Sequence, residues 1–369
     1  MKRLKRKVNI MRICADVKAL STLTVILLVI IAAIMGGIIA YAFTIAAYVE
    51  IPERTNLIIT DFYFDKENAT SFRISVLNPS YSPTDATING IAVSLKRATQ
   101  LYYATKTEPP IENGLVISSG ESLNITCLEV EKGDANITFG EFASEFAGKT
   151  IIVHVFSPDS SASNVEVTLP FVKLNITADF NPQISFKKFN VTLINDANSE
   201  VNLTIAWVSV VGIPVQNITP NIRIQSITVP KNSTLKINFD GDWHGLNETT
   251  IIVYTQQGYI FRKEVKLKTV NTAIQNVTFN ENYTDRFNVT IFNSAESATY
   301  VTVQKIVCTL EDGTTQTFED LSVEIMPNSS ETITLSWNWE EHRGETITVI
   351  AYFAQDFETL PFEATIPPP

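Results

Sequence analysis

Short stretches of alternating apolar and polar residues run along the chain after its first fifty residues. In the heptapeptide "FNVTIFN", Phe287, Val289 and Ile291 alternate with polar residues. This period of two predicts a β-strand with one buried side and one side facing water. Two similar heptapeptides precede it, "FNVTLIN" at residues 189–195 and "FRISVLN" at residues 72–78. The spacing of these three phrases indicates a repeated β unit.

The repeat extends beyond the phrase itself. Before each copy stands an apolar strand, and after it come a polar turn, further short strands and a segment rich in β-branched residues. Short alternating strands separated by Pro, Gly, Asn and Ser turns are typical of antiparallel β-sandwiches. We therefore expect an all-β fold of three tandem β-sandwich modules, at residues 50–170, 171–270 and 271–369. Almost no linker separates them, which predicts a semi-rigid stalk.

An uncharged apolar segment, residues 19–49, precedes these modules. About twenty apolar residues span the hydrocarbon core of a bilayer, so we expect a single transmembrane helix. Residues 1–18 carry seven cations against one aspartate and form a basic stub. Cations before the helix predict a cytoplasmic N-terminus and an extracellular body in the cell membrane. A secretory signal cleaved near Ala42 is the alternative.

Small residues recur at every fourth position within the apolar segment. Such a stripe lets a second helix approach closely, so we expect possible self-association through it. The helix-packing stripe comprises Ala32, Gly36, Ala40 and Thr44.

The charge is divided unevenly between the stub and the rest of the chain. The first eighteen residues sum to +6, which leaves −17 for the remainder of a chain with net charge −11. An acidic body repels nucleic acid, and we exclude that class of partner. The cysteines, Cys14, Cys127 and Cys308, are too few for a disulfide framework. Cys127 follows apolar alternate positions and is predicted to be a buried, inert thiol.

Thirteen N-x-[ST] sequons follow Val49. In the phrases, the Asn and Thr of a sequon share the polar side of the strand, so an oligosaccharide there would project outward. The alternative is an ordinary polar strand surface. The glycosylation candidates are Asn68, Asn124, Asn136, Asn175, Asn190, Asn202, Asn217, Asn232, Asn247, Asn276, Asn282, Asn288 and Asn328.

Residues that could act in catalysis or metal binding are few and lie far apart in the sequence. His154, His244 and His342 fall in three different modules. Asp240 and Asp242 form a single D-x-D, for which a solvated turn is favoured over a calcium site. "WNWEEHRG", residues 337–344, reads as a solvated loop over core tryptophans rather than a sugar site. We predict no enzymatic activity, no cofactor and no metal.

One insertion distinguishes the first module, "KRATQLYYATKTEPPIENG" at residues 96–114. It places two tyrosines beside cations in an otherwise acidic body, and tyrosine is enriched in protein contacts. We predict a contact loop for a protein or glycan partner, or else tyrosines that close one end of the sandwich. The contact-loop candidates are Lys96, Arg97, Tyr102 and Tyr103.

Two resemblances to known families add to this interpretation. "VKALSTLTVILLVIIAAI", residues 17–34, resembles the class III signal of archaeal pilin-like proteins. That resemblance implies processing at Lys18 and Ala19, with Leu20 beginning the mature chain. The order of strands and the "GES" turn at residues 120–122 resemble immunoglobulin-like, CARDB-type adhesion modules of archaeal and bacterial surface proteins.

The sequence thus predicts a membrane-anchored, extracellular, N-glycosylated stalk that acts in adhesion or envelope structure. Two alternatives stay open. One is a pilin-like filament subunit whose assembly helix begins at Leu20. The other is an accessory or binding subunit of a membrane complex.

Overall fold

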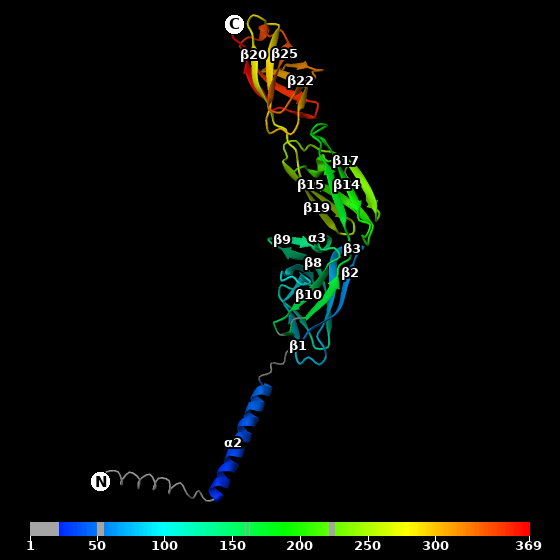
Figure 1. The fold of residues 1–369 in the computed structure, drawn as a ribbon, viewed down its shortest axis with the longest axis vertical. Helices are drawn as coiled ribbons and strands as arrows, with labels where there is room; N and C mark the ends of the chain where they lie inside the picture. Colours follow the sequence, from blue (N-terminus) through cyan, green and yellow to red (C-terminus); the bar gives the residue numbers. More distant parts are fainter. Residues whose placement is uncertain (1–21, 50–54, 159, 162, 221–225) are drawn as a thin grey trace, which may run out of the picture.

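The computed structural model describes residues 22–49, 55–158, 160–161, 163–220 and 226–369. The molecule is elongated, with one helix at one end and the C-terminus at the other (Figure 1). Between them lie three β regions, which we define as residues 55–168, 174–266 and 272–365. No named strand of one region pairs with a strand of another. The processing residues Lys18, Ala19 and Leu20 lie outside the described residues.

Helix α2 spans Thr22–Val49 and contains no charged residue. It is apolar on all sides, which is typical of a helix surrounded by lipid or by other helices. Its described side chains, from residue 24 to residue 45, are all exposed. At about 1.5 Å per residue the helix is about 42 Å long, more than the ~30 Å of a hydrocarbon core. It is therefore long and apolar enough to cross a membrane.

The first β region contains one continuous eight-stranded sheet, in the order β12-β10-β5-β6-β8-β3-β2 with β9 paired to β8, and two pairs, β1 with β11 and β4 with β7. Strand β6 joins the two halves of the sheet, because it pairs with β5 at its start and with β8 over the rest of its length. The elements are β1 Thr55–Asn56, β2 Ile58–Asp65, β3 Asn68–Leu77, β4 Ala86–Ile88, β5 Gly90–Leu95, β6 Tyr102–Glu108, β7 Leu115–Ile117, β8 Ser122–Lys132, β9 Ala135–Thr138, α3 Phe139–Glu145, β10 Thr150–Phe156, β11 Ser160–Ser161 and β12 Ser163–Thr168.

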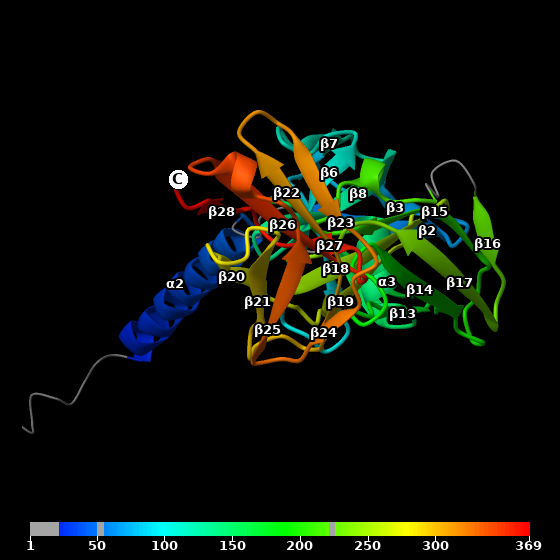
Figure 2. The same ribbon diagram turned by 90° about the horizontal axis from the view of Figure 1, so that it is seen from above.

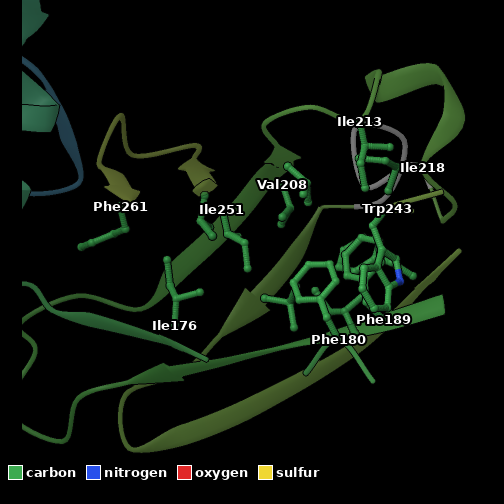
Figure 3. Close-up of a cluster of buried hydrophobic side chains, with 14 of the residues drawn as sticks. Ile176, Phe180, Phe189, Val208, Ile213, Ile218, Trp243, Ile251 and Phe261 are labelled. Atoms are coloured by element: carbon green, nitrogen blue, oxygen red, sulfur yellow. The ribbon is translucent and has the colours of Figure 1, made fainter. Parts of the chain in front are cut away.

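The second β region packs the three-stranded sheet β13-β14-β17 against the four-stranded sheet β16-β15-β18-β19. Phe180, Phe189 and Trp243 lie between the sheets with Ile251 and other apolar side chains (Figure 3). Its elements are β13 Leu174–Asp179, β14 Lys188–Asn195, β15 Leu203–Val210, η1 Val215–Asn217, β16 Ile227–Val229, β17 Ser233–Asp240, β18 Glu248–Thr255 and β19 Ile260–Lys266.

The third β region repeats this plan, with the sheet β20-β21-β25 facing a six-stranded sheet built around β22 and β26. Its elements are β20 Thr272–Phe279, β21 Arg286–Asn293, β22 Val301–Leu310, β23 Thr315–Phe318, β24 Val323–Ile325, β25 Ser329–Ser336, η3 Glu340–His342, β26 Thr346–Phe353, β27 Phe357–Glu358 and β28 Phe362–Thr365. Seen from above, the three-stranded sheets of the second and third regions lie on different sides of the long axis (Figure 2). The second and third regions are thus rotated relative to one another about that axis.

The predicted fold class is confirmed: the chain is all-β and immunoglobulin-like after one N-terminal apolar helix. The repeated phrases are strands β3, β14 and β21. Each lies between two other strands of its sheet. Their phenylalanines Phe72, Phe189 and Phe287 are buried, as the alternation predicts.

The asparagine that ends each phrase is a buried clamp. Asn78, Asn195 and Asn293 are all fully buried. The Nδ2 of Asn195 donates to the carbonyls of Val201 (3.1 Å) and Val229 (3.0 Å). Asn78 and Asn293 each make the same pair of bonds, to the carbonyl six residues later and to one near the end of the paired short strand. One side chain thus ties three segments of each β region together.

Candidate functional site

The joint between the first and second β regions, the lower joint, is closed by hydrogen bonds. The Ala69 N–H donates to the Gln257 carbonyl (2.6 Å), and the Tyr259 hydroxyl donates to the Lys66 carbonyl (3.1 Å). Tyr259 is fully buried, and burial raises the pKa of its hydroxyl. The β18–β19 turn of the second region is therefore inserted against the β2–β3 turn of the first.

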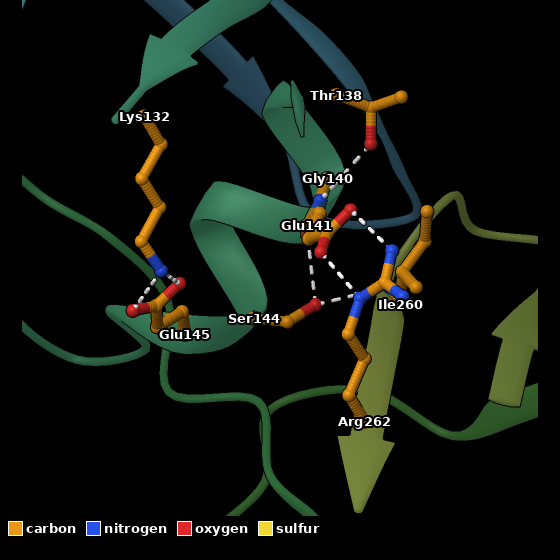
Figure 4. Close-up of polar contacts among 8 residues, drawn as sticks. All are labelled: Lys132, Thr138, Gly140, Glu141, Ser144, Glu145, Ile260 and Arg262. Atoms are coloured by element: carbon orange, nitrogen blue, oxygen red, sulfur yellow. Dashed lines mark hydrogen bonds and ion pairs between the residues drawn. The ribbon is translucent and has the colours of Figure 1, made fainter. Parts of the chain in front are cut away.

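Helix α3 supplies the other half of the lower joint (Figure 4). Its Glu141 forms a bidentate ion pair with Arg262 of β19, at 2.6 and 3.2 Å. The Ser144 hydroxyl oxygen accepts a hydrogen bond from the Ile260 N–H (3.1 Å). Paired donors and carboxylate oxygens of this kind give directional contacts. The hydrogen bonds that Arg262 donates to Glu141 raise the pKa of Arg262.

Two glycines allow the backbones to approach closely at the lower joint. A Cβ added to Gly140 would lie 2.0 Å from the Gly258 carbonyl oxygen. Gly258 has φ +87°, and a Cβ there would lie 2.7 Å from Thr70 Cγ2. A left-handed backbone conformation and lack of space both require glycine at position 258. This joint is a packed contact, not a flexible linker.

The joint between the second and third β regions, the upper joint, repeats the same arrangement. The Phe186 N–H donates to the Gln355 carbonyl (2.8 Å), and the Ser185 hydroxyl donates to Asp356. The ring of Phe357 packs on Phe186, with centroids 5.1 Å apart. Ala69 and Phe186 each lie three residues before the buried phenylalanine of their strand. In both joints, therefore, the backbone N–H at this equivalent position donates to a carbonyl of the next region.

The inserted turns share a motif, glutamine followed two residues later by an aromatic residue. Gln257 and Gln355 each accept, through Oε1, a backbone N–H of their own region at 3.1 Å. Their backbone carbonyls face the preceding region, and the aromatics Tyr259 and Phe357 are buried in the joint. We name this segment the Gln-x-aromatic turn. The corresponding segment of the first region, "SPDSSA" at residues 157–162, contains neither residue type.

His244 lies at the edge of the upper joint. Its ring stacks on Phe357 (4.7 Å, 16°) and meets Phe186 edge-on (5.0 Å). Burial lowers the pKa of His244, and the neighbouring Asp242 opposes that shift. A cleft of about 590 Å³ opens beside it, lined by both regions, with Lys305, Tyr352 and several carboxylates on the side of the third.

The sequons are all at or near the surface. Eleven of the thirteen asparagines are exposed, and Asn190 and Asn288, on central strands, are half-buried. Those within strands lie in β3, β8, β9, β13, β14, β20 and β21, on the side of each β region that contains the repeated phrase. In the described strands of the opposite sheets of the second and third regions, none occurs. Glycosylation itself stays a prediction.

The predicted contact loop contains strand β6, and the contact prediction is wrong for Tyr102, which instead follows the alternative of a tyrosine packed into the β region. Residues 102–108 form β6, and Tyr102 is only 6% exposed, packed on Phe142 and Phe146 of the α3 segment. Tyr103 points the other way and is 47% exposed, because successive residues of a strand face opposite sides. Lys96 pairs with Glu166 (2.6 Å), and Arg97 forms an exposed turn with φ +71°.

The helix-packing stripe is exposed along α2. The Thr44 hydroxyl donates to the Ala40 carbonyl (2.7 Å), which masks its polarity within the helix. Ala32 and Gly36 complete the stripe, and a Cβ on Gly36 would meet nothing within 4 Å. The stripe is therefore free to receive a second helix, and self-association stays a prediction.

The remaining chemical candidates are dispersed. His154 contacts Ser94 (2.9 Å), and His342 pairs with Glu345 and stacks on Trp337. In the described part of the chain, no group of three or more His, Cys, Asp or Glu side chains could hold a metal ion. Burial raises the pKa of the Cys127 and Cys308 thiols to about 12, which agrees with the predicted inert thiol at Cys127.

Comparison with known proteins gives no family. No family model matches the chain, and no curated protein matches it. Similar solved structures include the archaeal flagellum of Methanospirillum hungatei strain JF1, at 14% identity over 40% of this chain and 90% of that one, with a TM-score of 0.25. Others are the FN1–FN3 domains of chicken CNTN1 (11% identity, 85% and 98% coverage, TM-score 0.23) and Escherichia coli alpha-2-macroglobulin (9%, 86% and 35%, 0.21). At such values, function must be argued from this chain's own residues.

Proposed function

We propose that this protein is a membrane-anchored extracellular stalk whose three β regions are separate immunoglobulin-like domains stacked end to end. The observation that supports this most directly is the repeated joint. Both joints use a backbone N–H at the equivalent position, the backbone carbonyl of a glutamine at the equivalent position, and a buried aromatic ring. A joint of this kind holds successive domains at a fixed angle, so the third domain is carried away from helix α2. Adhesion or envelope structure is the role that suits such a shape.

The orientation of the stalk is the first testable consequence. The basic stub precedes α2, and cations before a membrane helix favour a cytoplasmic N-terminus. We expect protease added to intact cells to release the β regions and leave an N-terminal epitope tag protected. The matched control is the same treatment after the membrane is made permeable, which should destroy the tag. A tag digested on intact cells would contradict the proposed topology.

A filament subunit is the second candidate. The exposed helix α2 is as consistent with a filament subunit as with an anchored stalk. All described side chains of α2 are exposed, as an assembly helix in an isolated subunit would be. The resemblance to a class III signal implies cleavage after Ala19. Intact mass and N-terminal sequencing of the native protein separate the candidates: a mature chain that begins at Leu20 supports the filament, and an uncleaved chain supports the anchored stalk.

We further propose that the sequons carry glycans in the native organism. Asn232 and Asn328 lie in equivalent turns, with φ of +56° and +60°, and both are exposed. We expect glycopeptide mass spectrometry to find these two turn sites more fully occupied than the half-buried Asn190 and Asn288. If every site is found bare, the asparagines are only polar strand surface.

A further inference from the structure

The far end of the third β region repeats the surface that receives the next region in both joints. Thr284 lies three residues before Phe287, the position held by Ala69 before Phe72 and by Phe186 before Phe189. Its carbonyl accepts the Trp339 N–H (3.1 Å), as the Phe186 carbonyl accepts the Trp243 N–H (2.9 Å). The local backbone at Thr284 is therefore arranged as it is in the upper joint.

The tryptophans confirm this equivalence. Trp243 donates its indole N–H to the carbonyl of Lys188, the residue before Phe189 (3.2 Å). Trp339 donates to the carbonyl of Arg286, the residue before Phe287 (2.8 Å). Both indoles are fully buried. The loops that surround Thr284 are thus supported in the same way as those that hold the third region on the second.

The decisive difference is that no described residue of the chain occupies the third surface. The Ala69 and Phe186 N–H groups donate to turn carbonyls of the following region. The Thr284 N–H donates to none of the described residues, and the adjacent Tyr283 is 53% exposed. The Thr284 N–H can therefore donate to a backbone carbonyl of a partner, and the exposed Tyr283 ring lies beside it. A free backbone donor next to an exposed aromatic side chain suits a protein contact.

Charge indicates which kind of turn fits. In the lower joint, Glu141 pairs with Arg262, five residues after Gln257. At the far end, Glu340 and Glu341 are exposed, and Glu340 accepts a hydrogen bond from the Thr284 hydroxyl (3.3 Å). These carboxylates can receive a cation in the place that Glu141 occupies below. In the upper joint the residue five positions after Gln355 is Leu360, which is 85% exposed. Leucine carries no charge, so the upper joint has no ion pair at this position.

We propose that Tyr283, Thr284, Trp339, Glu340 and Glu341 form a distal socket for the Gln-x-aromatic turn of an immunoglobulin-like domain of another protein. The turn would carry Arg or Lys five residues after its glutamine, as the β18–β19 turn does. A second copy of this chain is not the occupant, because both of its Gln-x-aromatic turns are buried in its own joints. The inference deepens the proposed stalk function, since the socket lies at the end farthest from α2 (Figure 1).

The test uses the full chain in detergent micelles and a cyclised hairpin peptide with the sequence of residues 248–266. We expect saturable binding by fluorescence anisotropy. Tyr259→Ala in the peptide, which leaves the protein unchanged, should weaken binding at least tenfold, because the buried ring is lost. Thr284→Pro in the protein, which removes the N–H, should have a similar effect.

A charge exchange controls for misfolding. The Arg262→Glu peptide should not bind the native chain. The same peptide should bind a chain that carries Glu340→Lys and Glu341→Lys. No binding of the native peptide at about 1 mM, or equal binding of the Tyr259→Ala peptide, would overturn the proposal. The protease experiment on topology does not involve the peptide, so the socket and the stalk can fail separately.

Discussion

Gly140→Ala is expected to open the lower joint and leave both adjoining β regions folded. The new Cβ would lie 2.0 Å from the Gly258 carbonyl oxygen, far inside van der Waals contact. The obstacle is backbone on a tight turn with φ +87°, so it cannot be relieved by a rotamer change. The second region must move away from α3, and the contacts made by Tyr259 and Arg262 are lost.

The magnitudes decide the direction of this effect. Alanine is the better helix former, which would stabilise α3 by up to about 1 kcal/mol. Against this, exposing a ring the size of Tyr259 costs about 2 kcal/mol. Each hydrogen bond lost, such as Ala69 to Gln257, costs about 1 kcal/mol more. We expect the joint to lose about 2–4 kcal/mol in all.

Spin labels on Ser122 and Lys236, both exposed, would measure the opening in full-length protein. Cys14 must first be replaced, whereas Cys127 and Cys308 are buried and should not react. The native chain should give a narrow distance distribution and Gly140→Ala a broad one. Gly90→Ala is the matched control, because a Cβ there makes only an ordinary contact with Phe156 at 3.6 Å. An unchanged distribution in Gly140→Ala would show that the lower joint is not the rigid element.

Local periodicity was sufficient to predict the strands and the helix. The phrase at Phe287 alternates strictly, and a strand with one buried side must show that alternation wherever it lies. Residues 22–49 are uniformly apolar, which no soluble surface helix is. These features are carried by each segment alone, so no knowledge of its neighbours was needed.

The insertion in the first β region could not be interpreted in this way. Tyr102 and Tyr103 are chemically identical in sequence, and only the pairing of β6 with both β5 and β8 decides which one is buried. A strand that joins two halves of one sheet has no signature in composition or spacing. The partly alternating run from residue 102 to residue 108 was the available signal, and it left both the contact loop and the packed tyrosines open.

The joints and the asparagine clamps were not predicted from the sequence, for a related reason. Gln257 and Gln355 are polar residues in turns, where polar residues are ordinary. Asn195 ends a strand, where asparagine usually marks a turn in water. Their roles depend on carbonyls and N–H groups far away in the sequence, such as Val229 for Asn195. Recurrence of asparagine at the same position in all three repeats, and of glutamine in the second and third, was the signal that could have revealed them.

Asn195→Asp is expected to unfold the second β region at the lowest denaturant concentration of any change considered. The substitution keeps the shape of the side chain and replaces the Nδ2 donor by a carboxylate oxygen. The carbonyls of Val201 and Val229 then face an acceptor instead of a donor, at a site that is fully buried. Two buried carbonyls lose their partner, and a charge is left without a counterion.

We expect a loss of about 3–5 kcal/mol in the free energy of unfolding, measured by urea denaturation of the full chain followed by Trp fluorescence. Asn238→Asp is the matched control, because Asn238 lies on the exposed side of β17 in the same region. That change should shift stability by no more than about 0.5 kcal/mol. Asn293→Asp should reproduce the loss in the third region, since its Nδ2 makes the equivalent bonds to Thr299 and Ile325. Equal effects of Asn195→Asp and Asn238→Asp would mean that the added charge, not the clamp, determines the loss.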